Sequence, residues 1–163
     1  GEGSDDEMCT VSMFVHGIAT TAAESCGAGT TPSSGRFEVT FDTSEALRSS
    51  TRLDGEFVGP VVGSIYRADD VGFTGPNDGA QPVADFSFER IDLRAGADGP
   101  YLIDTVLPAG DYQFLGYMDT DGNAATVDGP DLNDPIMIPS RASTLDCTVS
   151  PITIQFPILL PDL

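Results

Sequence analysis

The segment 119–134, DTDGNAATVDGPDLND, carries the side chains with the clearest chemical potential. It holds five aspartates and two asparagines in 16 residues, directly after the apolar run 112–118. No lysine or arginine lies between Arg94 and Arg141, so no cationic side chain nearby in the sequence neutralises these carboxylates. Oxygen donors at alternating positions, with a glycine among them, are the ligands that a hard cation such as Ca²⁺ requires. The segment therefore predicts a calcium site.

This segment does not follow the EF-hand pattern. Asp119, Asp121 and Asn123 stand at the first, third and fifth ligand positions of that loop. However, Ala124 stands where the EF-hand needs glycine, and Pro130 stands where it needs a bidentate glutamate. The flanking segments also read as strands. We therefore expect a structural Ca²⁺ in a loop that follows a strand, where the ion shapes the loop and performs no chemistry.

The predicted metal ligands all carry a side-chain oxygen, and they are Asp119, Asp121, Asn123, Asp128 and Asp134. Asp131 is an alternative source of the later carboxylate. Aspartate, asparagine and glycine are also the commonest turn residues, so a solvated hairpin loop is the competing interpretation. In that case the carboxylates accept hydrogen bonds from backbone N–H groups instead of binding a cation.

Other residue sets that could support catalysis are weaker, and we predict no catalytic residue. His16 is the only histidine, and no G-x-S-x-G motif presents a nucleophilic serine. Asp69, Asp70 and Asp78 form a second acidic group in a turn-rich segment. Paired carboxylates serve glycoside hydrolysis, but in a chain this acidic a solvated loop is the simpler interpretation.

The charge balance restricts the partners. The chain has 26 acidic residues against seven arginines and no lysine, for a formal net charge of -19. Such a polyanion repels nucleic acids and anionic lipid headgroups and attracts cations, and its self-repulsion favours a soluble monomer. The lack of lysine excludes Schiff-base chemistry, and there is no tryptophan to stack against a sugar. A protein or glycan partner of unknown identity fits this composition best.

Three cysteines and the start of the chain bear on localisation. Cys9, Cys26 and Cys147 are too few for a zinc site with one histidine, and we predict one disulfide whose pairing the sequence leaves open. No apolar stretch of about 20 residues is present to cross a membrane. The acidic residues 1–8 resemble the tether of a bacterial lipoprotein whose lipidated cysteine would lie upstream. We therefore predict an extracellular or periplasmic protein with a flexible tether at 1–8 and one domain at 9–163, and a lipid anchor through an upstream residue is one form that this prediction takes.

The elements that must position these side chains are strands. Period-two alternation and turn residues dominate, whereas helical periodicity is confined to a capped turn at 44–50. The predicted strands fall at 9–18, 36–41, 57–67, 83–93, 101–107, 112–118, 136–138 and 152–158. Pro157 favours an edge position for the last strand, and Gly59-Pro60 favours a bulge or an edge in the third. Seven or eight short strands without a βαβ rhythm predict an all-β fold, a single antiparallel or mixed β-sandwich of prealbumin-like or immunoglobulin-like type.

One passage resembles known families. The sequence LPAGDY at 107–112, followed by an apolar strand, resembles the L-P-x-G-x-Y segment of prealbumin-like and carboxypeptidase-regulatory-like β-sandwiches. Its continuation GYMDTDGN at 116–123 is similar to small secreted bacterial domains of unknown function. The resemblance covers roughly 30 residues and implies the fold class but no activity. Tyr112 resembles a tyrosine corner, in which the hydroxyl bonds back to the chain.

Together these features predict a secreted or surface-tethered, non-enzymatic accessory or binding domain with a structural calcium ion in the 119–134 loop. Two alternatives stay open. The first is a small hydrolase or carbohydrate-active protein that uses paired aspartates. The second is a purely structural domain of the cell envelope that binds no ligand.

Overall fold

The computed structural model describes residues 32–53, 56–124, 126 and 129–160. Several sequence predictions lie outside these ranges, and they concern the tether 1–8, the strand 9–18, Cys9, His16, Cys26 and Asp128. Among the described residues, no helix has the length and apolar character needed to cross a membrane.

The first sheet is built around β1 (Ser34–Thr43). On one side β1 pairs in parallel with β11 (Val149–Phe156), and on the other it pairs antiparallel with β6 (Asp98–Leu102). The short strand β7 (Leu107–Pro108) also pairs with the start of β1. The sheet is therefore mixed, with β11 at one edge.

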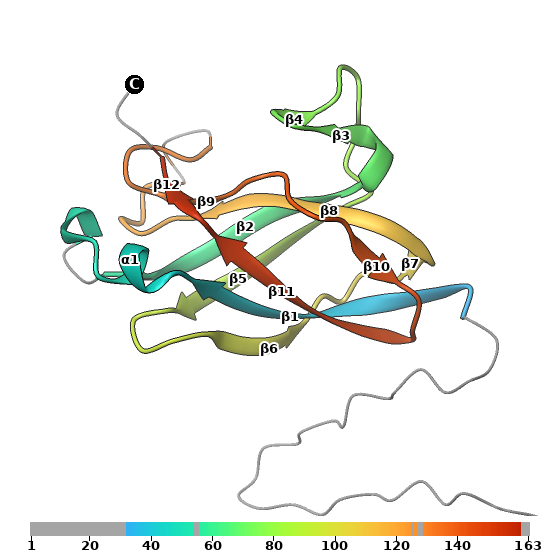
Figure 1. Ribbon diagram of the computed structural model, residues 1–163, viewed down its shortest axis with the longest axis horizontal. Helices are drawn as coiled ribbons and strands as arrows, with labels where there is room; N and C mark the ends of the chain where they lie inside the picture. Colours follow the sequence, from blue (N-terminus) through green and yellow to red (C-terminus); the bar gives the residue numbers. More distant parts are fainter. Residues whose placement is uncertain (1–31, 54–55, 125, 127–128, 161–163) are drawn as a thin grey trace, which may run out of the picture.

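The second sheet has the order β12–β9–β8–β2–β5, with β10 beside β8. Its strands are β2 (Val58–Arg67), β5 (Ala84–Asp92), β8 (Gly110–Met118), β9 (Pro135–Met137), β10 (Ser143–Leu145) and β12 (Ile158–Leu159). Every pairing within it is antiparallel. A separate hairpin of β3 (Val71–Gly72) and β4 (Gly75–Pro76) stands out from the upper edge of the molecule in Figure 1.

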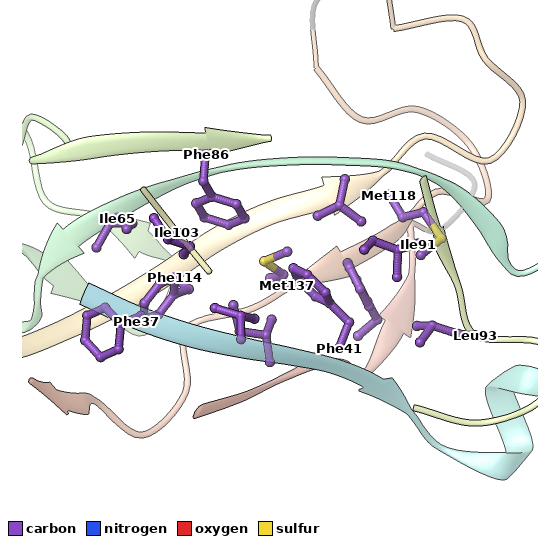
Figure 2. Close-up of a cluster of buried hydrophobic side chains, with 14 of the residues drawn as sticks. Phe37, Phe41, Ile65, Phe86, Ile91, Leu93, Ile103, Phe114, Met118 and Met137 are labelled. Carbon is purple, nitrogen blue, oxygen red and sulfur yellow. The ribbon is translucent and has the colours of Figure 1, made fainter. Parts of the chain in front are cut away.

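The core lies between the two sheets. Alternate residues of β1 are fully buried, namely Phe37, Val39 and Phe41, because successive side chains of a strand point to opposite faces. Figure 2 shows Phe37 and Phe41 among apolar residues of the opposing sheet, which include Phe114, Met118 and Met137 from β8 and β9. Phe37 packs edge-on against Phe114, with 5.1 Å between the ring centroids.

The predicted all-β sandwich is confirmed, in its mixed form, because β1 and β11 are parallel. The strand count was too low, since the described ranges contain twelve strands. The predicted strand 101–107 divides into β6 and β7, and β10 and the β3–β4 hairpin were not predicted. Strands of two or three residues carry too little alternation to be recognised in a sequence.

The predicted helical turn and the predicted irregularity at Gly59-Pro60 are both present. Helix α1 (Glu45–Arg48) is capped by Ser44, whose Oγ accepts a hydrogen bond from the N–H of Leu47 at 3.2 Å. Two short 3₁₀ turns, η1 (Thr51–Leu53) and η2 (Ala68–Asp70), complete the helical structure of the described ranges. The register of β2 against β5 shifts between Gly59 and Val61, so the Gly59-Pro60 pair marks a bulge in a central strand and not an edge.

Tyr112 forms the bond that the tyrosine-corner pattern predicts. Its ring is fully buried, and its hydroxyl donates to the carbonyl oxygen of Pro108 at 2.6 Å. This bond fixes the turn that leads into β8. Strand β8 therefore has a fixed start. It ends at Met118, and the acidic loop begins at the next residue.

Candidate functional site

Asp119 directly follows β8 and organises the first turn of the acidic loop. Its side chain is buried, with the residue 4% exposed. Oδ1 accepts hydrogen bonds from the N–H groups of Gly122 at 2.8 Å and Asn123 at 3.2 Å. Oδ2 accepts one from the N–H of Ala124 at 3.0 Å. Burial opposes ionisation, but these N–H donors outweigh it and hold the pKa of Asp119 below its ordinary value.

Asp134 closes the other end of the loop and is 1% exposed. Its Oδ1 accepts a hydrogen bond from the N–H of Thr120 at 3.2 Å, and its Oδ2 accepts one from the N–H of Asp131 at 3.0 Å. Here burial dominates, and together with the nearby charges of Asp131 and Asp119 it raises the pKa of Asp134 above its ordinary value. The two ends of the loop are thus joined through the bond from Thr120 to Asp134.

The middle of the loop is joined by the side-chain amide of Asn123. Its Nδ2 donates to Oδ2 of Asp121 at 2.8 Å and to Oδ2 of Asp131 at 2.6 Å. The other oxygen of Asp131, Oδ1, is the one buried side-chain N or O atom among the described residues that has no hydrogen-bond partner. The amide N–H groups of Asn123 therefore lie between the carboxylates of Asp121 and Asp131. A cation bound at this place would neutralise those two charges, which the uncharged amide does not do.

The structure brings four of the five predicted ligands into one loop. Asp119 and Asp134 hold its two ends, whereas Asp121 and Asn123 lie in its middle, and Asp128 lies outside the described residues. Within the described ranges, no group of three or more acidic, cysteine or histidine side chains is arranged to hold a metal ion. The carboxylates accept hydrogen bonds from N–H groups, as the competing interpretation of the sequence expects, and the calcium site stays a prediction.

A second site, which the sequence analysis missed, covers the outer face of the second sheet. In β2, Val61 and Ile65 are fully buried in the core. Because side chains alternate along a strand, Val62, Ser64 and Tyr66 point to the opposite, outer face. This is the face on which an antiparallel sheet usually exposes polar residues to water.

The strand register surrounds these residues with apolar neighbours. Val62 is paired with Tyr117 of β8, and Tyr117 is paired in turn with Ile136 of β9. Leu115 of β8 is paired with Ser64. Residues directly opposite each other in an antiparallel pair share a face. The outer face of three neighbouring strands is therefore largely apolar.

This face is concave, and we call it the outer hollow. Its volume is about 820 Å³. The side chains that give it its apolar character are Val62, Tyr66, Leu115, Tyr117, Ile136 and Ile138. Thr74, Gly75 and Pro76 of the β3–β4 hairpin form one wall, and Pro130 of the acidic loop also lines it. Phe73, beside that wall in the hairpin turn, is 97% exposed.

One charged side chain lines the outer hollow within the described residues. It belongs to Asp85 of β5, which is paired with Ser64 and accepts a hydrogen bond from the Ser64 hydroxyl at 2.6 Å. Ser87, two residues further along β5, lies on the same face beside Val62. Asp85 and Ser87 thus give the hollow a polar side along β5.

The sequence does contain a signal for the outer hollow. Adjacent apolar pairs such as Val61–Val62 and Phe114–Leu115 break the alternation expected of a strand with one face in water. Strands that are apolar on both faces are covered on both faces or bind something there. The register places Tyr66 and Tyr117 on this outer face.

The comparisons add no relative. No protein-family model matches this sequence, and searches of curated proteins and of solved structures found no match either. The acidic loop and the outer hollow are therefore the features of the molecule that bear on its function.

Proposed function

We propose that the protein is a non-enzymatic binding domain that holds a small, largely apolar ligand in the outer hollow. The observation that supports this is the concave apolar surface over β2, β8 and β9, on the side of the sheet away from the core. Its volume of about 820 Å³ falls in the range of small-molecule sites. Its floor consists of paired strands, which hold their side chains more rigidly than a loop would.

The β3–β4 hairpin gives further support. Phe73 is 97% exposed and directly precedes Thr74, which lines the hollow, so its ring is available to a ligand that extends beyond the sheet. The neighbouring residues Thr74 to Pro76 already line the hollow. A ligand held there would contact both the sheet and the hairpin.

The test is calorimetric titration with naphthylmethanol, a neutral aromatic probe. We expect saturable binding to the wild type and its loss in Leu115→Glu, which puts a charge on the floor of the outer hollow. Leu102→Glu is the matched control, because Leu102 lies in β6 of the first sheet, is 42% exposed and does not line the hollow. Absence of binding to the wild type, or equal loss in both variants, would refute the proposal and favour a purely structural domain.

We also propose that the acidic loop binds a structural Ca²⁺ ion. The support is the unpartnered Oδ1 of Asp131, the excess of carboxylates in the loop and the net charge of -19. Binding would require Asn123 to turn its amide so that its oxygen, and not its N–H groups, faces the carboxylates. Asp119 would contribute little, because its oxygens already accept three backbone hydrogen bonds.

Thermal unfolding can distinguish a specific Ca²⁺ site from general screening of the negative charge. A bound ion stabilises the native state by mass action, so millimolar Ca²⁺ should raise the melting temperature and chelator should reverse the rise. Asp121→Ala should abolish that response. An equal response to Mg²⁺ at the same ionic strength, unchanged in Asp121→Ala, would show that screening of the net charge is the whole effect.

For localisation we propose an extracellular or periplasmic protein with one disulfide from Cys147 to Cys9 or Cys26. The support is the acidic, turn-rich composition and the position of Cys147 in the turn between β10 and β11, where it is half-buried. Peptide mapping by mass spectrometry, with and without reduction, would identify the pair. Three alkylated cysteines in the unreduced protein purified from an oxidising compartment would contradict it.

A further inference from the structure

We propose that the ligand of the outer hollow is a small organic cation, with an aromatic or aliphatic body and one protonated amine. This inference rests on the proposed binding function and adds the charge of the ligand to it. It is argued from where the polar groups of the hollow lie and from which sign of charge they favour.

The position of Asp85 at the hollow favours a ligand with a positive charge. The register pairs Asp85 with Ser64, and Ser64 with Leu115, so the carboxylate lies at the side of an apolar row that crosses β2 and β8. The bond from the Ser64 hydroxyl, at 2.6 Å, holds one oxygen of the carboxylate in place. Within the part of the chain that the structure describes, no hydrogen bond engages the other oxygen, Oδ2, which is available to an ammonium group that donates hydrogen bonds and accepts none.

Two tyrosines line the same hollow as this carboxylate. Tyr66 lies two residues beyond Ser64 on the outer face, about 7 Å along the strand. Tyr117 lies beside Val62, two residues before Ser64. Along the strand direction, Asp85 therefore lies between the levels of the two tyrosines, with Tyr66 on the neighbouring strand β2 and Tyr117 one strand further away on β8. Tyrosine rings attract cations to their faces, and the attraction grows where water is partly displaced.

The electrostatic field of the whole molecule also favours a cationic ligand. With 26 acidic and seven basic residues, the chain repels anions and attracts cations at long range. The lining of the outer hollow, within the described residues, carries a carboxylate and no arginine to counter it. Among the described residues that line the hollow, an anionic ligand would find no cationic partner, and the field around the molecule would repel it.

The experiment compares three probes with the same ring system, titrated calorimetrically at one ionic strength. They are naphthylmethylamine as the cation, naphthylmethanol as the neutral probe and naphthoate as the anion. We expect the amine to bind about fivefold to tenfold more tightly than the alcohol, from one partly exposed ion pair and one cation–π contact. Naphthoate should bind more weakly than the alcohol.

Two matched variants locate the charge preference. Asp85→Asn keeps an oxygen that can accept the Ser64 bond but removes the charge, so it should lower amine affinity about threefold or more and leave the alcohol unchanged. Asp104→Asn removes the same charge from an exposed residue outside the hollow and should preserve the ratio of the two affinities. Equal binding of amine and alcohol, or equal effects of both variants, would overturn the inference and leave the hollow as a binding site. If no probe binds the wild type, the proposed function itself fails.

Discussion

Replacing Asp119 with asparagine tests how the acidic loop is held. The carboxylate accepts three backbone hydrogen bonds, two at Oδ1 and one at Oδ2. Asparagine has nearly the same shape and keeps one acceptor oxygen, so the bonds at the Oδ1 position survive. At the Oδ2 position its NH₂ group meets the N–H of Ala124, and two donors then face each other. One buried N–H group therefore loses its partner.

The cost can be estimated from that single mismatch. An N–H group left unsatisfied in a buried site costs about 1–3 kcal/mol, and hydrogen bonds to a charged acceptor lie at the upper end of that range. We therefore expect Asp119→Asn to lower the free energy of unfolding by about 2 kcal/mol at pH 7. With a urea m-value of about 2 kcal/mol/M, the unfolding midpoint should fall by about 1 M.

The destabilisation caused by Asp119→Asn should depend on pH in a defined direction. Because the pKa of Asp119 is lowered on folding, its contribution is present above its ordinary value of 3.8 and is lost as the pH falls through the lower folded pKa. A protonated carboxyl presents the same donor mismatch as an amide. The stability difference between wild type and Asp119→Asn should therefore shrink towards zero as the pH is lowered below 3.8.

The assay is urea unfolding followed by circular dichroism, in chelator, at pH 7 and at several values below 4. Asp121→Asn is the control, because it removes an exposed carboxylate two residues away and should change stability by less than about 0.5 kcal/mol. Equal destabilisation by both variants, or a difference for Asp119→Asn that persists at low pH, would refute the argument that the carboxylate acts by accepting these bonds.

Three further predictions concern the sandwich itself. Tyr112→Phe removes the bond to Pro108 and should lower the free energy of unfolding by about 0.5–1.5 kcal/mol in urea unfolding, with no change in the m-value. Gly116→Ala should cost about 1–3 kcal/mol in the same assay, because the new Cβ would meet the backbone oxygen of Val62. Tyr101 should titrate at about pH 12 by ultraviolet absorbance, since burial, followed by a hydrogen bond to the carboxylate of Asp98, raises its pKa to about 12. Because that pKa is raised on folding, its stabilisation should be intact below pH 10 and lost as the pH rises towards 12.

The sequence predicts those parts of the sandwich in which a local pattern is compatible with one type of element. The alternation of Phe37, Val39 and Phe41 requires a strand with one buried face, and β1 has it. Ser44 before a short run of helix formers predicts a capped turn, which is present. The parallel pairing of β1 with β11 was not predictable in this way, because the partner of a strand depends on contacts between residues more than 100 positions apart.

The roles of the aspartates were less predictable, because aspartate has several. The same spacing of Asp119 and Asp121 fits a cation ligand and a cap for backbone N–H groups, and local sequence does not separate the two. Burial separates them in part: Asp119 is enclosed by its own turn, whereas Asp121 is exposed. The outer hollow was missed because it arises from register, which places Tyr117 beside Val62 across two strands that are distant in the chain.

Strand β8 connects the two candidate sites. Its residues alternate between the core, as in Phe114, and the outer hollow, as in Leu115 and Tyr117. The strand then ends at Asp119, whose carboxylate closes the turn that follows. The loop returns through Pro130, which lines the outer hollow, to β9, which supplies Ile136 beside Tyr117. Because the loop joins two strands of the hollow, whatever fixes its shape, whether backbone hydrogen bonds alone or a cation as well, also fixes the spacing of the side chains that would contact the ligand.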